Sequence, residues 1–187
     1  MTGKGSLNHN SRKFHAKNTD PNRTHWNVEY CNEDIKDVYH ELFDEALKRY
    51  NDKQTRKDRK IDDYYEKIRS GKQEKLFHEV IIQIGDKDNM GSEMMEGQLA
   101  AKILDEYMKG FQERNPALRI FAAHLHLDEA TPHLHIDFIP YVTGSKRGLD
   151  TRVSLKQALS SLGFKGGSRS ETELNQWIQS EKEKLAM

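Results

Sequence analysis

Hydrophobic residues between positions 35 and 50 recur at intervals of three or four, the spacing of a helix with one buried face. They are Ile35, Val38, Tyr39, Leu42, Phe43, Ala46, Leu47 and Tyr50. Asn32 comes just before this run and two acidic residues follow it, so we expect Asn32 to cap the helix. A second, shorter helix is predicted over residues 58–70, where Gly71 ends it.

Three other segments have the residue types of strands. Residues 76–84 are rich in β-branched side chains, and residues 118–128 and 133–141 are two apolar runs joined by a short turn. The shortness of the turn predicts that the last two segments pair as an antiparallel hairpin.

Helices are predicted on both sides of this hairpin. One covers residues 96–113, another begins at Ser154, and a last, charged helix covers residues 170–185. The predicted buried face of the first consists of Leu99, Ile103, Tyr107 and Phe111. Together, the elements predict an α+β fold with a central antiparallel sheet and helices packed on it.

The composition is that of a single polar domain. The chain has 187 residues, of which 35% are hydrophobic and 32% are charged, enough for one core. No apolar stretch is long enough to cross a bilayer, and the N-terminus lacks the apolar segment of a secretory signal. The one cysteine, Cys31, excludes an internal disulfide and a thiolate zinc finger, and it favours a cytoplasmic location.

The net charge of zero hides an uneven distribution. Residues 1–30 carry five basic and two acidic residues, and residues 143–169 carry six basic residues and one acidic residue. Between them, residues 31–113 carry 15 basic and 20 acidic residues. Because contact with a polyanion depends on local clusters of charge, the zero total excludes indiscriminate polycation-like binding and leaves localised contact with DNA open.

Four of the nine histidines lie in the predicted hairpin. Residues two apart in a strand share a face, so His124 and His126 point the same way, as do His133 and His135. The imidazoles can therefore converge across the turn, while the intervening apolar residues face the core. Those apolar residues are Leu125, Leu127, Leu134 and Ile136.

Three imidazoles on a rigid sheet suit a divalent metal and leave coordination positions open for a further ligand. Asp128 and Glu129 lie in the turn, where a carboxylate can orient a ligand, bind the metal or accept a proton. The alternative is a polar strand face whose histidines only pair with these carboxylates. Two His-x-His pairs around an acidic turn favour the metal site.

The hairpin carries one motif, which reads His126-Leu-Asp-Glu129-Ala-Thr-Pro132-His133-Leu-His135 and is followed by Pro140. A second motif lies upstream and reads His9-Asn10-Ser11-Arg12, followed by the segment DPNRTHWNVEY at residues 20–30. In this order, the two resemble the motifs of the plasmid mobilisation and recombination relaxases, the Mob/Pre (MobV) family of HUH endonucleases. The resemblance covers residues 8–164.

The resemblance implies a relaxase that nicks one strand of plasmid DNA at an origin of transfer and rejoins it by transesterification. It implies a side chain that stays covalently bound to the 5′ end, and manganese or magnesium, with zinc or nickel as alternatives, to neutralise phosphate charge. By resemblance, the metal ligands are His126, His133 and His135. Glu129 is the catalytic acidic residue beside them, and His9 is the nucleophile.

A histidine nucleophile is chemically reasonable because neutral imidazole is available near pH 7. Tyr30 is the reserve candidate, although its place in an alternating segment predicts a packed strand residue. Arg12 and Arg23 are expected to bind the DNA backbone, and Asn10 is expected to position the DNA or the nucleophile.

Basic and aromatic side chains elsewhere are further candidates for DNA contact. We expect a basic set downstream of the hairpin to follow the backbone of single-stranded or hairpin DNA. It consists of Lys146, Arg147, Arg152 and Lys156. Phe14 and Trp26 could stack on bases, although an aromatic residue at either position is more often part of a core.

Two features depart from the family pattern. Family members have a strand before the His9 motif, whereas residues 1–8 of this chain are poor strand formers. His124 is a fourth histidine, which we expect to support a ligand or to face DNA. We expect a catalytic domain over residues 1–170 and, over residues 171–187, the start of a C-terminal helical extension through which a longer protein dimerises.

Two other functions stay open at this point. One is an origin-recognition module that binds DNA without cleaving it, and the other is a His-rich metalloenzyme that acts on small molecules. A covalent protein–DNA adduct would distinguish the relaxase from both.

Overall fold

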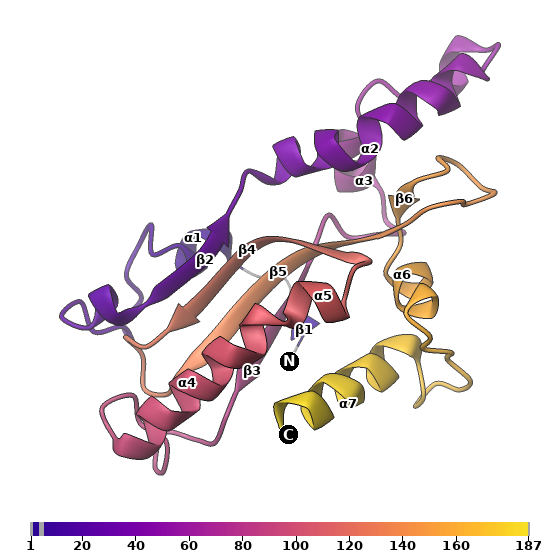
Figure 1. Ribbon diagram of the computed structural model, residues 1–187. Coiled ribbons are helices and arrows are strands. Elements are labelled where there is room, and N and C mark those ends of the chain that lie inside the picture. Colours follow the sequence, from indigo (N-terminus) through magenta and orange to yellow (C-terminus); the bar gives the residue numbers. More distant parts are fainter. Residues whose placement is uncertain (1, 4–5, 187) are drawn as a thin grey trace.

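The computed structural model describes residues 2–3 and 6–186. Its centre is an antiparallel sheet with the strand order β1-β3-β5-β4-β2, and β6 pairs with β5 (Figure 1). The strands are β1 Thr2–Gly3, β2 Val28–Asn32, β3 His78–Gln83, β4 Leu118–His126, β5 His133–Val142 and β6 Arg152–Val153. The predicted α+β fold with a central antiparallel sheet is confirmed.

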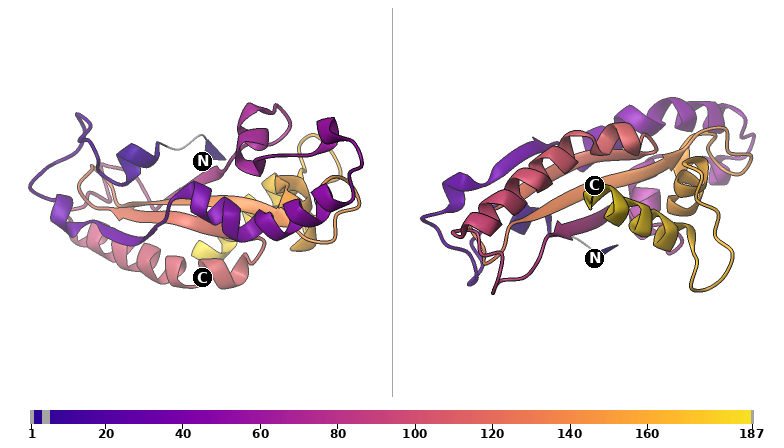
Figure 2. Two further views of the ribbon diagram at one scale, coloured as in Figure 1. Left: turned by 90° about the horizontal axis from the view of Figure 1, so that it is seen from above. Right: turned by 60° about the horizontal axis from the view of Figure 1, so that its bottom comes forward.

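Helices cover both faces of this sheet. They are α1 Leu7–Asn10, α2 Ile35–Asp52, α3 Tyr64–Ser70, α4 Met95–Lys109, α5 Phe111–Arg114, α6 Leu155–Ser161 and α7 Glu173–Leu185. Short 3-10 turns lie at Thr24–Trp26 and Lys57–Arg59. Figure 2 shows α1 and α3 on one side of the sheet and α4 and α5 on the other. Within the described ranges, none of these helices has the length and apolar composition to span a membrane.

The predicted hairpin is the centre of the sheet. β4 and β5 pair so that His124 lies opposite His135 and His126 lies opposite His133. The intervening apolar residues point to the other face, where α4, α5 and α7 cover them. This main core includes Leu104, Phe111, Leu125, Leu134, Ile136 and Trp177, each at most 2% exposed. Alternation along the strands therefore separates an apolar face from a face that carries the histidines, as predicted.

A second core occupies part of the histidine face. Here α2 and α3 pack Tyr39, Phe43 and Tyr64 against Phe121 of β4 and Ile139 of β5. Phe121 and Ile139 lie in the half of the hairpin that is distant from its turn. The other half carries the histidines, and α1 and the loop after it lie over that half.

Two helix starts differ from the prediction. Asn32 is the last residue of β2 and pairs with Ala122, so its backbone is extended and does not cap α2. Asp34 caps α2 instead, and its side chain accepts a hydrogen bond from the backbone N–H of Lys36 at 2.8 Å. α3 begins at Tyr64 rather than at residue 58, because the Asp63 side chain provides its cap. Gly71 ends α3 as predicted.

The predicted buried face of α4 is wrong in half of its residues. Leu99 is 59% exposed and Ile103 is 39% exposed, whereas Leu104 is fully buried. Two apolar stripes run along α4, and the structure buries the one that contains Gly97, Ala100, Leu104, Tyr107 and Met108. Gly97 has no room for a side chain, because a Cβ there would lie 1.9 Å from the carbonyl oxygen of Gly91 in the loop before α4.

The ends of the chain also pack on the sheet. Thr2 and Gly3 pair antiparallel with Val80 and Glu79 of β3. The expectation of no strand before the His9 motif is therefore wrong for residues 2–3. Residues 1 and 4–5 lie outside the described ranges. Pairing at a sheet edge uses only backbone groups, which overrides a poor strand propensity. At the other end, the Trp177 indole of α7 donates a hydrogen bond to Asn115 Oδ1 at 2.8 Å. The domain boundary at residue 170 and the helical extension stay predictions.

Candidate metal centre and active site

Three imidazoles converge where β4 ends and β5 begins. The ring centroids of His126 and His135 are 4.7 Å apart, those of His133 and His135 are 4.9 Å apart, and those of His126 and His133 are 5.3 Å apart. All three side chains are buried. Strand pairing produces this cluster, because each pair of histidines occupies one face of adjacent antiparallel strands.

One nitrogen of each imidazole is held by an oxygen atom outside the cluster. The contacts are His126 Nε2 to the carbonyl oxygen of Asn10 at 2.8 Å, His133 Nδ1 to that of Thr131 at 2.7 Å, and His135 Nδ1 to Glu79 Oε1 at 2.7 Å. Carbonyl and carboxylate oxygens accept hydrogen bonds, so the ring nitrogen in each contact carries the proton. The opposite nitrogen of each ring is left with its lone pair, as a metal ligand requires.

The free nitrogens fit a divalent metal. Within the part of the chain that the structure describes, His126 Nδ1 and His135 Nε2 are buried and have no hydrogen-bond partner. Leaving such atoms unpaired costs free energy, and a metal ion would satisfy both. Two overlapping groups place their ligand atoms within 4.8 Å of one another: His9 with His126 and His135, and Glu129 with His126 and His133. The predicted three ligands therefore fall into two groups, which share His126 and also include His9 and Glu129.

Burial keeps two imidazoles of the cluster neutral near pH 7. Burial lowers the pKa of His126 to about 2, and burial likewise lowers the pKa of His133. Burial would raise the pKa of Glu79, but hydrogen bonds from His135 and Asn10 outweigh it and lower that pKa. His126 and His133 therefore present neutral nitrogen ligands, and an ionised carboxylate lies beside the cluster.

α1 places His9 at the edge of this cluster. His9 Nε2 lies 3.2 Å from Glu129 Oε1 and 3.2 Å from Arg12 Nη1. Its ring centroid is 5.8 Å from that of His126 and 6.0 Å from that of His135, while its side chain is still 20% exposed. Burial and the Arg12 guanidinium lower the pKa of His9, although Glu129 acts in the opposite direction. His9 is thus a neutral, accessible imidazole beside the candidate metal ligands.

Two arginines hold the turn that carries Glu129. Arg12 donates from Nε to Asp128 Oδ2 at 2.9 Å and from Nη2 to Glu129 Oε1 at 2.8 Å. Arg23 donates from Nη1 to the carbonyl oxygens of Leu127 at 3.2 Å and Glu129 at 3.3 Å. The backbone of Arg12 has a φ of 52°, a region that is strained for a non-glycine residue. The contacts of its side chain offset the free-energy cost of this backbone conformation.

Asp128 anchors this arrangement from the turn. Burial would raise the pKa of its carboxyl, but hydrogen bonds from Arg12 and Thr24 outweigh burial and lower that pKa to about 2. The ionised Asp128 therefore holds the guanidinium in place, and Arg12 can bridge Asp128, Glu129 and His9 at once.

The Asn10 side chain has internal partners. It is only 1% exposed and donates hydrogen bonds to Glu79 Oε1 at 2.9 Å and Asp137 Oδ2 at 3.0 Å, so the expectation that it positions the DNA or the nucleophile stays a prediction. Arg12 and Arg23 also have mainly internal contacts, with side chains 8% and 15% exposed. Their expected contacts with phosphate stay predictions, and neither is a free surface cation.

The downstream basic residues lie away from the histidines. Lys146 and Arg147 follow β5, whose ten residues span about 30 Å from the histidine end. Arg152 Nη2 lies 3.7 Å from Glu74 Oε1, and Lys156 Nζ lies 3.8 Å from Glu173 Oε1 with its side chain 78% exposed. The structure therefore does not bring these four cations to His9, and their contact with DNA stays a prediction.

Three aromatic residues near the motifs have definite positions. Phe14 is 49% exposed and Trp26 is 42% exposed, so the interpretation of either as a core residue is wrong. Tyr30 packs on the main core, and its hydroxyl donates to Asp105 of α4 at 2.7 Å. Tyr30 thus faces away from the histidines, which removes it as the reserve nucleophile. The fourth histidine, His124, pairs with Glu29 Oε2 at 3.2 Å.

Sequence reasoning missed Glu79 and Asp137, which lie opposite each other on β3 and β5. Both are buried on the histidine face, and burial raises the pKa of Asp137 to about 7. The sequence signal for both is an acidic residue within an otherwise apolar strand. Burying a carboxylate costs free energy unless a partner pairs or hydrogen-bonds with it, so such a residue indicates a polar site.

A partly exposed imidazole beside a buried histidine cluster, on an antiparallel sheet, defines a site suited to metal-assisted reaction of an anionic substrate. The sequence matches the plasmid recombination enzyme family, Mob_Pre, over residues 5–184, so the chain belongs to this family. The resemblance noted from the motifs is confirmed.

Solved structures provide further comparisons. The chain is similar to a Mn-bound crystal structure of the MobM relaxase domain with plasmid pMV158 oriT DNA, with 27% identity, a TM-score of 0.47 and coverage of 88% of this chain and 70% of that chain. A second Mn-bound MobM–DNA structure has 26% identity and a TM-score of 0.45, covering 81% and 67% of the two chains. No curated protein sequence matches the chain significantly.

Proposed function

We propose that this protein is a relaxase that nicks and rejoins one strand of DNA at a specific site in a plasmid or mobile-element origin of transfer. The observation that supports this most directly is the position of His9, a neutral and accessible imidazole beside histidines whose free nitrogens suit a divalent metal. Membership of the plasmid recombination enzyme family agrees with it.

In the proposed reaction, a lone pair on the His9 imidazole attacks the scissile phosphorus. An N–P bond forms as the P–O3′ bond breaks, so the 5′ end becomes linked to His9 and the leaving 3′ oxygen takes up a proton as a hydroxyl. Attack of a 3′-hydroxyl on the same phosphorus reverses the step, releases His9 and rejoins the strand. No net oxidation or reduction occurs.

Glu129 and Arg12 are proposed to orient the nucleophile. Glu129 Oε1 can accept the proton of the His9 ring, which stabilises the positive charge that develops on imidazole as it attacks. Arg12 holds Glu129 in position and adds a positive charge next to the phosphate. The lowered pKa of His9 favours its neutral form near pH 7, in which one ring nitrogen keeps a lone pair for attack.

His126, His133 and His135 are proposed to hold the divalent metal, with manganese or magnesium as the preferred ion. When bound, the ion would neutralise phosphate charge and orient the phosphate for in-line attack. The outer contacts to Asn10, Thr131 and Glu79 keep the ligand nitrogens unprotonated and fixed in direction.

A random-sequence single-stranded DNA library with Mn2+ tests this function against every possible target sequence at once. Strands that become covalently attached are captured under denaturing conditions and sequenced, which also identifies the site. We expect adducts with the natural chain and with His15→Ala, an exposed histidine in the same segment. We expect none with His9→Ala.

Each other outcome would reject part of the proposal. An adduct that persists in His9→Ala would show that the nucleophile is wrong. Binding of DNA without any adduct would favour an origin-recognition module, and absence of binding would favour a small-molecule metalloenzyme. The cytoplasmic location, the choice between single-stranded and hairpin DNA, and dimerisation through a C-terminal helical extension stay predictions.

A further inference from the structure

A cavity lies near the C-terminal end of β5, whereas the histidine cluster lies at the N-terminal end of this strand. Its volume is about 510 Å3, within the range of pockets that enclose small organic ligands. It lies between the end of α2, α3 and the segment that leads into β6. Its walls combine aromatic and apolar side chains with three cations, and they include Tyr50, Tyr64, Ile68, Lys67, Lys72 and Arg152.

Two of the three cations around this cavity have no acidic partner among the described residues, whereas the third, Arg152, faces Glu74, which also lines the cavity. Lys67 and Lys72 are exposed, and neither forms an ion pair with any acidic group in the described ranges. Residues 48–75 carry 11 basic and six acidic residues, whereas residues 33–47 carry one basic and six acidic residues. The acidic middle of the chain is therefore polarised, with its positive end at the cavity.

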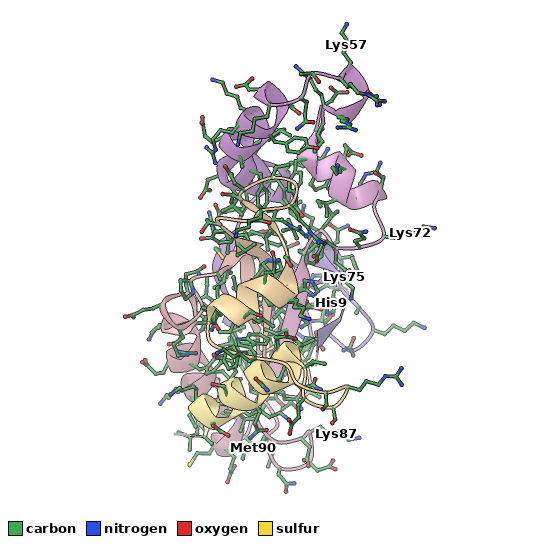
Figure 3. All side chains as sticks on the ribbon, turned by 90° about the vertical axis from the view of Figure 1, so that its right-hand side faces the viewer. His9, Lys57, Lys72, Lys75, Lys87 and Met90 are labelled. Atoms are coloured by element: carbon green, nitrogen blue, oxygen red, sulfur yellow. The ribbon has the colours of Figure 1, made fainter. Side chains whose placement is uncertain are left out.

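The cavity lies on the same side of the sheet as the nucleophile. Figure 2 shows α3 and α1 on one side, and in Figure 3 Lys72 and Lys75 come between Lys57 and His9 along the long axis of the molecule. Tyr141 is the sixth residue after His135 along β5, and it pairs with Val153 next to Arg152. At the rise of an extended strand, this separation is about 20 Å.

We infer that this cavity receives one unstacked nucleotide of the single DNA strand that is nicked at His9, an inference that rests on the proposed function. A base would lie against Tyr50 and Ile68, and the flanking phosphates would contact Lys67 and Lys72. Aromatic contact with a base and lysine contact with phosphates is the usual chemistry of single-strand binding. At about 3.4 Å per nucleotide of a stacked strand, 20 Å corresponds to about six nucleotides from the nick.

Oligonucleotides of two lengths test this inference. They carry the sequence captured by adduct formation, with a single-stranded arm of either 3 or 12 nucleotides on one side of the nick, and each side is tested in turn. Affinity is measured by fluorescence anisotropy for the natural chain, for Lys67→Glu with Lys72→Glu, and for the matched control Lys182→Glu with Lys184→Glu. The control makes the same charge change on α7, which packs on the other face of the sheet.

On one side of the nick, the longer arm is expected to bind roughly tenfold more tightly than the shorter arm. The Lys67 and Lys72 substitutions should remove this gain in affinity. They should also reduce the salt dependence of binding by the contribution of about two phosphate contacts. The α7 control should show the same gain and the same salt dependence as the natural chain. Pairing the arm with a complementary strand should also remove the gain, because a paired base cannot enter the cavity.

Three results would overturn the inference: equal affinity for both lengths on each side, equal behaviour of the two double variants, or the same gain with a duplex arm. These failures are distinct from failure of the proposed function. If no adduct forms at all, the relaxase itself is rejected, whereas an adduct without any length dependence rejects only the cavity as a nucleotide site.

Discussion

At the scale of single residues, the site depends on which ring nitrogen of each histidine carries a proton. One hydrogen bond to each ring determines which nitrogen is protonated. The acceptors are the backbone oxygens of Asn10 and Thr131 and the carboxylate of Glu79. Asn10, which follows His9 in sequence, contributes twice. Its backbone oxygen accepts from His126, and its side chain donates a hydrogen bond to Glu79. The residue next to the proposed nucleophile is thereby tied to two of the proposed metal ligands.

Substitution of Glu79 by Gln tests the importance of this outer layer. The amide is nearly the same size, but it removes the negative charge that faces His135 Nδ1. We expect Mn2+ affinity, measured by isothermal titration calorimetry, to fall roughly 10- to 100-fold. Glu113→Gln, an exposed acidic residue on α5, is the matched control and should bind as the natural chain does. Equal affinity in both variants would contradict the role given to Glu79.

A half-buried histidine outside the site predicts part of the pH dependence of stability. Burial, followed by the nearby Lys75, lowers the pKa of His78 to about 4, against about 6.5 in an unfolded chain. Between these values the unfolded chain binds the proton and the folded chain does not, so stability is lost as the pH falls from about 6.5 to 4.

The variant His78→Gln cannot take up this proton. In chemical denaturation of the metal-free protein, we expect it to lose roughly 1–3 kcal/mol less stability than the natural chain between pH 7.5 and pH 4.5. His25→Gln, which changes an exposed histidine, should follow the natural chain. Parallel pH profiles for all three proteins would show that His78 titrates normally.

Much of the residue-level site could be predicted from the sequence. The His-x-His spacing alone places His133 and His135 on one face, because strand alternation is a local property. Glu79 and Asn10 could not be assigned in this way, since their contacts with the cluster come from β3 and α1. Those contacts depend on the order of strands in the sheet, which the sequence pattern does not determine.

At the scale of elements, the helices show where a periodic pattern is insufficient. α4 has apolar residues on two stripes, and the structure buries Leu104 while Leu99 stays on the surface. Strands and the hairpin are predicted well because their alternation has only two faces, one of which must be apolar. Helix starts are predicted less well, since Asn32, Asp34 and Asp63 are all acceptable caps by residue type.

A pair of substitutions in α4 tests the corrected face. Leu104→Ala removes a fully buried side chain from the main core, and we expect it to cost about 2–5 kcal/mol of unfolding free energy. Leu99→Ala makes the same chemical change at a position that is 59% exposed, and it should cost less than about 1 kcal/mol. Urea denaturation of both variants measures the difference. Similar losses would mean that both stripes are buried.

At the scale of the whole molecule, the sheet joins two regions that the sequence keeps apart. The histidine cluster lies at one end of β5, and a concentration of unpaired lysines lies near the other end, on the same side as His9 (Figure 3). The sequence shows that charge is uneven, but it assigns the whole of residues 31–113 to an acidic region. Within that region, residues 33–47 are mainly acidic and residues 48–75 are mainly basic, and the packing of α2 and α3 places the basic part at the cavity.

Metal binding should stabilise the whole fold, because the ligands come from both strands of the central hairpin. At a Mn2+ concentration of about 100 times the dissociation constant, linkage adds about 2.7 kcal/mol. For a chain of this size, that corresponds to a rise of roughly 5–10 °C in Tm, which a chelator should reverse. His126→Ala should show no rise in a thermal-shift assay. The same rise in that variant would place the metal elsewhere.

In the proposed reaction, His9 forms a covalent bond with the 5′ end of a nicked DNA strand. The most direct measurement is mass spectrometry of the trapped adduct after digestion of the protein and the DNA under alkaline conditions, which preserve an N–P bond. We expect a nucleotide mass on the peptide that contains His9 and on no other peptide. A nucleotide attached to a tyrosine, or to a different histidine, would contradict it.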